Sequence, residues 1–96
     1  MPYEVIFSAE AEMQLQQIET YLAGRFYPAN VERFIESLAQ ACVSLGIAPH
    51  RGTKRDDLIP GLRTIGFEHR VTIYFKLVEN EVLIVSVLYG GRTFKP

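Results

Sequence analysis

Hydrophobic and polar positions along the chain follow two different periods, one in each half. In the first half, apolar residues recur at intervals of three and four, the spacing that lines one face of an α-helix. The longest such run starts at Val31 and continues at offsets of 3, 4, 7, 10, 11 and 14 residues. In the second half, apolar and polar residues alternate, as they do in a strand with one buried face. The pattern therefore predicts helices first and a sheet afterwards.

A short strand and two helices are predicted in the first half. Residues 3–7 are rich in β-branched and aromatic side chains, which favours a strand. Ser8 is a suitable N-cap for the first helix, and Gly24 marks its end. Pro28 suits the first position of the second helix, which Gly46 stops. Because few residues join them, the two helices should form an antiparallel hairpin.

Three further strands are predicted after a long loop. Residues 46–61 show little periodicity and carry several turn-forming residues, so they are expected to be a loop. Strands are predicted at residues 62–67, 70–78 and 81–89, and the last should be central because it is apolar on both faces. The order is β-α-α-β-β-β, an α+β fold in which a helical hairpin packs on one face of a mainly antiparallel sheet. One domain over residues 1–96 is expected.

The core should form where the helical stripes meet one face of the sheet. Its predicted members are Leu15, Ile18, Leu22, Phe34, Ile35, Leu38, Ile73, Phe75 and Val85. The other face of the sheet should stay partly open, with Arg70, Thr72, Tyr74 and Lys76 alternating along it. Basic and aromatic side chains on an open sheet face are suited to binding phosphate or an acidic chain, although a solvated face would have the same composition.

Charge is divided unevenly between the two halves. Residues 1–49 carry two arginines against six glutamates, whereas residues 50–96 carry eight lysines or arginines against five acidic residues. The net charge of −1 therefore hides a basic second half, which favours an anionic partner. With no apolar run long enough to span a bilayer, no signal peptide and a single cysteine, a cytoplasmic protein without membrane contact is expected.

Familiar catalytic and cofactor-binding patterns are missing from the sequence. There is no glycine-rich phosphate loop, and the two histidines and Cys42 lack metal-ligand spacing, so no metal or cofactor is predicted. One enzymatic route remains, because clustered arginines can stabilise the charge that develops on a scissile RNA phosphate. Arg63, Arg70 and Arg92 could surround such a phosphate, but no group is placed to accept the 2′-hydroxyl proton.

The element order and several short segments resemble the RelE/ParE superfamily of toxins from type II toxin–antitoxin modules. The segments that carry the resemblance are residues 7–12, 49–52, 60–63, 70–75 and 87–92. No single segment is very specific, but together they span nearly the whole chain in the same order. The resemblance implies a small antitoxin as first partner.

Two toxin activities are found within that superfamily, and the resemblance leaves both open. RelE-like members are ribosome-dependent endoribonucleases that cut messenger RNA, and Arg63, Arg70 and Arg92 resemble three of their basic catalytic residues. The late tyrosine of that branch has no counterpart, because the sequence continues only to Pro96. ParE-like members poison DNA gyrase, and the short ending after Arg92 resembles them.

The resemblance therefore favours a ParE-like toxin that is not an enzyme, with a ParD-like antitoxin and DNA gyrase as partners. The alternative is a RelE-like nuclease that acts with the ribosome and mRNA, and a third possibility is a non-toxic binding domain on the same fold. The residues expected to contact a partner are Arg63, Arg70, Tyr74, Arg92 and Lys95.

Overall fold

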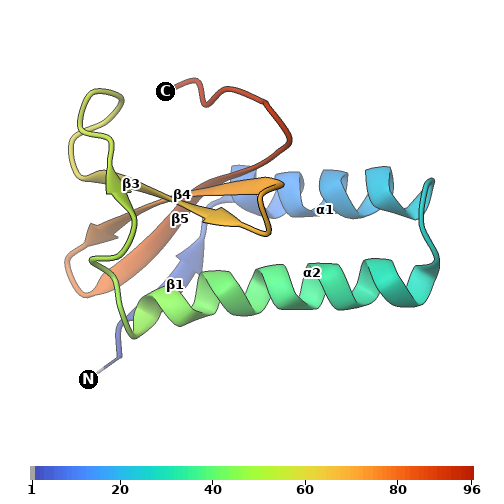
Figure 1. The fold of residues 1–96 in the computed structure, drawn as a ribbon. Coiled ribbons are helices and arrows are strands. Elements are labelled where there is room, and N and C mark those ends of the chain that lie inside the picture. The colour runs from blue at the N-terminus through green and yellow to red at the C-terminus, as the bar shows by residue number, and fades with distance from the viewer. Residues whose placement is uncertain (1) are drawn as a thin grey trace.

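The computed structural model describes residues 2–96 and contains two α-helices and a five-stranded sheet (Figure 1). In chain order, the elements are β1 (Glu4–Phe7), α1 (Ala9–Ala23), α2 (Pro28–Val43), a 3-10 turn (Ser44–Gly46), β2 (Thr53–Lys54), β3 (Leu62–Phe67), β4 (Val71–Val78) and β5 (Glu81–Tyr89). The predicted α+β order is confirmed, with one addition. The two residues of β2 lie in the segment expected to be a loop, and they form a fifth strand at one edge.

The sheet has the strand order β1-β5-β4-β3-β2. The four consecutive strands β2 to β5 form three antiparallel pairs, and β1 pairs parallel with β5. The sheet is therefore mainly antiparallel, as expected. β5 is an interior strand between β1 and β4, as its two apolar faces predicted, although the middle strand of the five is β4. Because β1 crosses from the start of the chain to pair with the last strand, the two halves of the sequence share one sheet.

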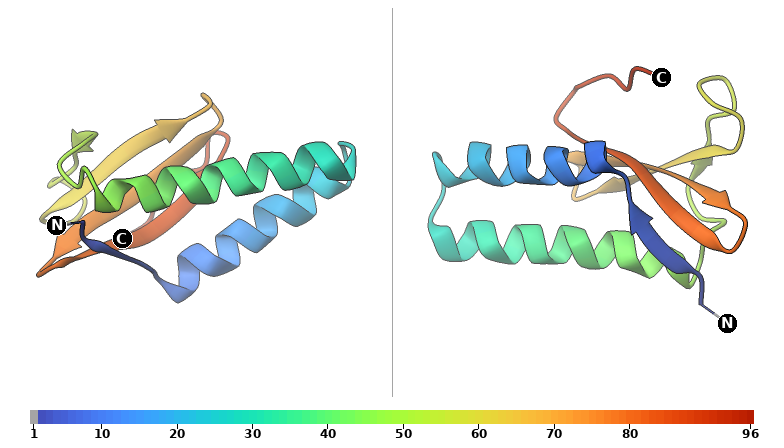
Figure 2. Two further views of the ribbon diagram at one scale, coloured as in Figure 1. Left: turned by 90° about the horizontal axis from the view of Figure 1, so that it is seen from below. Right: turned by 180° about the vertical axis from the view of Figure 1, so that it is seen from behind.

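Local signals in the sequence place both helices. The hydroxyl of Ser8 accepts a hydrogen bond from the N–H of Ala11 at 2.9 Å, which caps the start of α1. Gly24 is the C-cap of α1, and Pro28 is the first residue of α2. The helices run antiparallel as a hairpin whose tip extends beyond the sheet (Figures 1 and 2). No helix among residues 2–96 is long and apolar enough to cross a membrane.

The core lies between the helical hairpin and one face of the sheet. Five of the predicted members are buried in it: Ile18, Leu22, Leu38, Ile73 and Phe75. Leu15, Phe34 and Ile35 pack against this core but are only partly buried. The prediction for Val85 is wrong, because this residue contacts a second cluster on the far side of the sheet.

A β-bulge explains the error at Val85. In the pairing of β4 with β5, Phe75 lies opposite Ile84 and Tyr74 lies opposite Ser86, so Val85 is an extra residue without a partner. A bulge shifts the alternation of side chains by one residue. In β5, the even-numbered residues face the core before the bulge, and the odd-numbered residues face it after the bulge. Val87, not Val85, therefore continues the core face.

The far face of the sheet is covered, in contrast to the prediction. Tyr74 is buried there, and the ring of Phe94 in the C-terminal tail stacks on it with 4.7 Å between ring centroids. Leu62 and Leu88 complete this second cluster. The tail crosses the side of the sheet that faces away from α2 (Figure 1). Tyr74 is therefore a packing residue, and its phenol ring does not form part of an open array.

Cys42 gives the fold a pH dependence that can be measured. Burial raises the pKa of its thiol from 9.0 to about 12, so between these values the unfolded chain releases a proton that the folded chain keeps. We expect the folded state to lose up to about 1.4 kcal/mol per pH unit above pH 9, relative to a Cys42→Ala variant. Urea unfolding of both proteins from pH 8 to pH 11 measures the difference, and parallel curves would contradict it.

Candidate functional site

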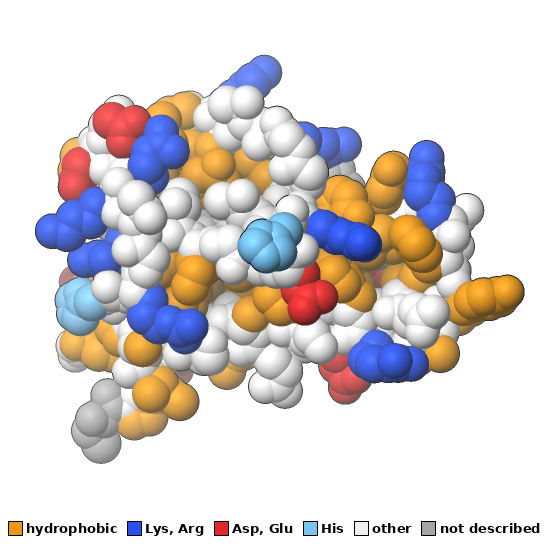
Figure 3. Space-filling view, viewed as in Figure 1, with side chains coloured by type: hydrophobic (Ala, Val, Ile, Leu, Met, Phe, Trp, Pro, Cys, Tyr) orange, Lys and Arg blue, Asp and Glu red, His pale blue; other side chains and the backbone are white. Residues whose placement is uncertain are grey.

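Basic side chains gather at the edge of the sheet formed by β2 and β3 (Figure 3). The antiparallel register of these two strands places Lys54 directly opposite Arg63. Like charges in this position repel each other and destabilise a sheet. We call Arg51, Lys54 and Arg63 the basic corner.

The basic corner has no acidic partner of its own. The single ion pair in the described chain, residues 2–96, joins Arg55 to Asp57 at 2.9 Å, and neither residue belongs to the corner. Hydrogen bonding to Arg55 lowers the pKa of Asp57 below its ordinary value, so this carboxylate is already engaged. The corner therefore presents positive charge that only an external anion can neutralise.

The side chain of Arg63 is held in place by the main chain. Its Nη1 donates to the carbonyl oxygen of His50 at 2.9 Å and also lies 3.4 Å from that of Arg51. Gly52 makes this approach possible, because its φ of +83° suits glycine and a Cβ there would collide with the carbonyl of Thr64. The bend after α2 thus orients Arg63 before any partner arrives.

Arg70 lies elsewhere than predicted. It belongs to the turn before β4, not to the strand, and it borders a hollow on the helix side with Leu22, Phe26 and Phe34. The expected alternation of Arg70, Thr72, Tyr74 and Lys76 on one open face is therefore wrong. The alternation of side chains between the two faces begins only where the strand begins. The direction of a side chain in the preceding turn therefore cannot be predicted from it.

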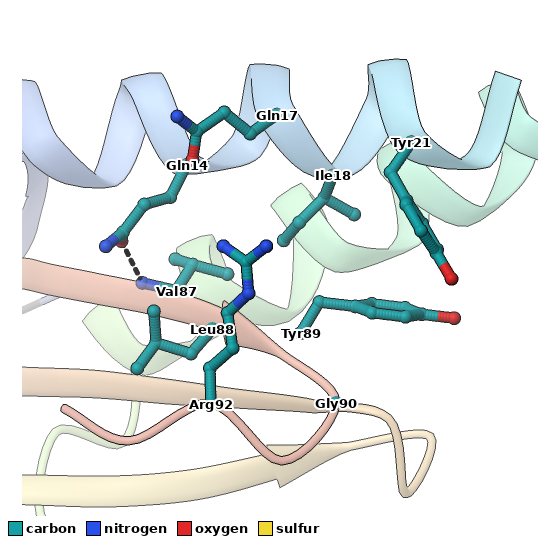
Figure 4. Close-up of a pocket in the computed structure, with 9 residues that line it drawn as sticks. All are labelled: Gln14, Gln17, Ile18, Tyr21, Val87, Leu88, Tyr89, Gly90 and Arg92. Atoms are coloured by element: carbon teal, nitrogen blue, oxygen red, sulfur yellow. Dashed lines mark hydrogen bonds between the residues drawn. The ribbon is translucent and has the colours of Figure 1, made fainter. Parts of the chain in front are cut away.

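Arg92 borders a slot between α1 and the last residues of β5 (Figure 4). The slot has a volume of about 290 Å³, and α1 contributes Gln14, Gln17, Ile18 and Tyr21 to its wall. Lys95 is exposed in the tail, next to the buried Phe94. Each of these two basic residues is accessible to a partner.

The three arginines of the nuclease alternative do not meet at one point. Arg63 pairs with Phe75, and Arg70 precedes that residue by five positions, a separation of about 17 Å along an extended chain. Arg92 lines the slot beside α1, whereas Arg70 lines the hollow beside α2. Groups of three or more potential metal ligands are likewise absent from the residues that the structure describes.

Gln14 is the residue of this region that the sequence analysis missed. Its Oε1 accepts from the N–H of Val87 at 2.6 Å and from the hydroxyl of Ser86 at 2.9 Å. A signal was present, because Gln14 lies three residues after Ala11 and four before Ile18, inside the apolar stripe of α1. A polar residue in such a stripe indicates a specific buried partner.

Comparisons with known proteins give one family match and two similar folds. A family model described as the ParE toxin of the type II toxin–antitoxin system parDE matches residues 5–94. A solved structure described as the chromosomal ParDE system from P. aeruginosa has a TM-score of 0.80 at 17% identity, and the match covers 92% of this chain and 96% of that one.

The toxin–antitoxin complex RelBE2 from Mycobacterium tuberculosis has a TM-score of 0.65 at 16% identity, with 93% and 99% of the two chains covered. At these identities, the two structures show a shared fold. No curated protein sequence gives a significant match.

Proposed function

The chain belongs to the ParE toxin family of type II toxin–antitoxin systems, and from this membership we propose that it inhibits DNA gyrase and is neutralised by a cognate ParD-like antitoxin. The observation that carries the proposal is the match of the family model over residues 5–94, nearly the whole chain. The proposed site of action is the cytoplasm, where both partners would be met.

The basic corner is the surface that we assign to the gyrase–DNA complex. Its three cations form no ion pair within the described chain, and Arg63 is already fixed by two main-chain carbonyl groups. A poison that holds a cleaved DNA complex needs contacts and not a catalyst, and cations arranged in this way suit the DNA backbone. Arg70, Arg92 and Lys95 remain proposed contacts, whereas Tyr74 is withdrawn because it is buried.

The geometry does not favour the nuclease alternative. A ribonuclease needs its cations around one phosphate and a group to accept the 2′-hydroxyl proton. Here Arg63 lies far along the sheet from Arg70, and Arg92 faces a different hollow. The proposal therefore assigns no catalytic residue to this chain.

Purified gyrase with supercoiled plasmid tests the proposal, alongside translating ribosomes with a reporter message. We expect cleaved DNA to accumulate and the message to stay intact. Cleavage of the message with gyrase unaffected would replace the proposal by the nuclease alternative. If expression of the chain neither slows growth nor affects either assay, the protein is instead a non-toxic binding domain.

A pair of charge variants tests the basic corner within the same assay. We expect Lys54→Ala to reduce the yield of cleaved DNA roughly tenfold or more, since each lost phosphate contact weakens binding in a salt-dependent way. Arg33→Ala is the matched control, because Arg33 is exposed on α2 and bonds only Asn30. Equal loss in both variants would show that total charge matters and the corner does not.

A further inference from the structure

The second half of β5 has an open edge. β1 pairs with residues 81–84 of β5 and ends there, so residues 85–89 extend past it. On the other side, the N–H of Gly90 donates to the carbonyl of Arg70 at 2.6 Å, which makes this a hydrogen-bonded pair with β4. Because such pairs alternate with non-hydrogen-bonded ones, the main-chain groups of Tyr89 and Val87 point away from β4.

Two side chains occupy part of this edge. The Oγ of Ser8 donates to the carbonyl oxygen of Val85 at 2.9 Å. Gln14 accepts the N–H of Val87 through Oε1, in the place where the carbonyl of a neighbouring strand would lie (Figure 4). Outside the ladder with β4, no hydrogen bond within residues 2–96 engages the carbonyl of Val87 or the main chain of Tyr89. The edge is therefore occupied at the carbonyl of Val85 and at the N–H of Val87, and it is free beyond them.

The slot beside this edge has room and a positive charge. The slot has a volume of about 290 Å³ and lies beside the edge of β5. An added strand would run there, about 4.8 Å from β5. Arg92 is the one charged residue in its lining, and no carboxylate opposes it. The rings of Tyr21 and Tyr89, with centroids 5.7 Å apart, form one end wall.

We propose that the slot takes an extended, acidic segment of the antitoxin, which adds to β5 as a new strand and displaces Gln14. The inference rests on the proposed function, because it names the part of the antitoxin that binds here. The main-chain groups of Val87 and Tyr89 supply the ladder hydrogen bonds of such a strand. Arg92 pairs with a carboxylate of the same segment, a charge-assisted bond that an uncharged segment lacks.

Removal of the Gln14 side chain should change the stability of the free protein and its affinity for the partner in opposite directions. In the free protein, the side chain of Gln14 shields a strand edge that would otherwise invite unspecific pairing. Its removal lowers the stability of the free protein but relieves the incoming strand of a competitor. A residue that only supported the fold would weaken binding or leave it unchanged when removed.

Affinity measurements with the protein product of the small gene next to the toxin gene test the competition. We expect Gln14→Ala to bind this probe roughly three- to tenfold more tightly, the gain that corresponds to one hydrogen bond that no longer has to be broken. Gln17→Ala is the matched control, because Gln17 lines the slot but bonds no group of β5. Its affinity should stay within about twofold.

Arg92 and the amide protons supply two independent readouts. We expect Arg92→Gln to weaken binding at least about tenfold, by the loss of a charge-assisted bond. By amide hydrogen exchange, Tyr89 should exchange fast in the free protein and become protected in the complex, as a ladder partner would make it.

The outcomes separate this inference from the proposed function. Tighter binding of Gln14→Ala with protection of Tyr89 supports the added strand. A complex in which Gln14→Ala binds no more tightly and Tyr89 still exchanges fast overturns the slot and leaves the toxin proposal standing. If the partner shields the rings of Tyr21 and Tyr89 from solvent but the amide of Tyr89 still exchanges fast, a helix docks in the slot. That result also overturns the added strand. Absence of any complex overturns both proposals.

Discussion

Replacement of Phe75 by alanine should destabilise the protein by about 3–5 kcal/mol, the loss typical of a fully buried phenylalanine. Phe75 has no exposed surface and lies in β4 at the bulge, and it belongs to the core cluster to which both helices contribute. A domain of this size has a total stability of roughly 5–15 kcal/mol, so the variant should be near the limit of folding. Urea unfolding followed by circular dichroism measures the difference.

Phe34→Ala is the matched control, and the structure changes the expectation for it. The sequence places both phenylalanines in the core, but Phe34 is only partly buried and borders the hollow next to Arg70. It contacts Phe67 edge-on, with ring centroids 5.5 Å apart. Its loss should cost about 1–2 kcal/mol, because less area is buried and one aromatic pair is broken. Equal losses for the two variants would contradict the assigned burial.

Gly46→Ala should have the second large effect, about 3 kcal/mol, because its Cβ has no space. Gly46 is buried in the 3-10 turn after α2, and its carbonyl accepts the N–H of Tyr3 at 2.7 Å. A Cβ here would collide with the carbonyl oxygen of Tyr3 and approach Cγ2 of Val5 to 3.0 Å. The obstacle is main chain, so a change of rotamer cannot relieve it, and the start of the chain must move away from the helix end.

Gly24→Ala is the control for the same substitution in open surroundings. Gly24 caps α1 with ordinary helical angles, and the nearest atom to a new Cβ is the carbonyl oxygen of Tyr21 at 3.7 Å. Alanine should therefore be neutral or stabilise by up to about 1 kcal/mol, through a less flexible unfolded chain. Hydrogen exchange at β1 completes the test, because only Gly46→Ala should loosen the amides there. A stable Gly46→Ala variant with a protected β1 would refute the contact.

Local physics explains why most elements could be predicted. The helix stripes, Ser8 and Pro28 act within one or two turns of the chain, and alternation in a strand depends on neighbouring residues alone. The interior position of β5 also follows from its own composition, since a strand that is apolar on both faces must be covered on both. The two residues of β2 are too few to show any alternation, so that strand was missed.

The candidate sites depended on contacts between distant residues. Tyr74 alternates like a surface residue, but Phe94, twenty positions later, folds back onto it. Gln14 meets Val87 across 73 positions, and Lys54 meets Arg63 only because β2 pairs with β3. Neither hydrophobic periodicity nor a capping residue in the sequence predicts such long-range contacts.

The sequence by itself determined the kinds of elements, their order and the family that they resemble, because these follow from periodicity, caps and short-range sterics. Only the tertiary structure decided which polar groups face one another. It separated Arg63 from Arg70, buried Tyr74, and left half of β5 open beside Arg92. The physical reason is that a bulge, a turn or a chain end changes the direction of a side chain without altering the hydrophobic pattern on which the prediction rests.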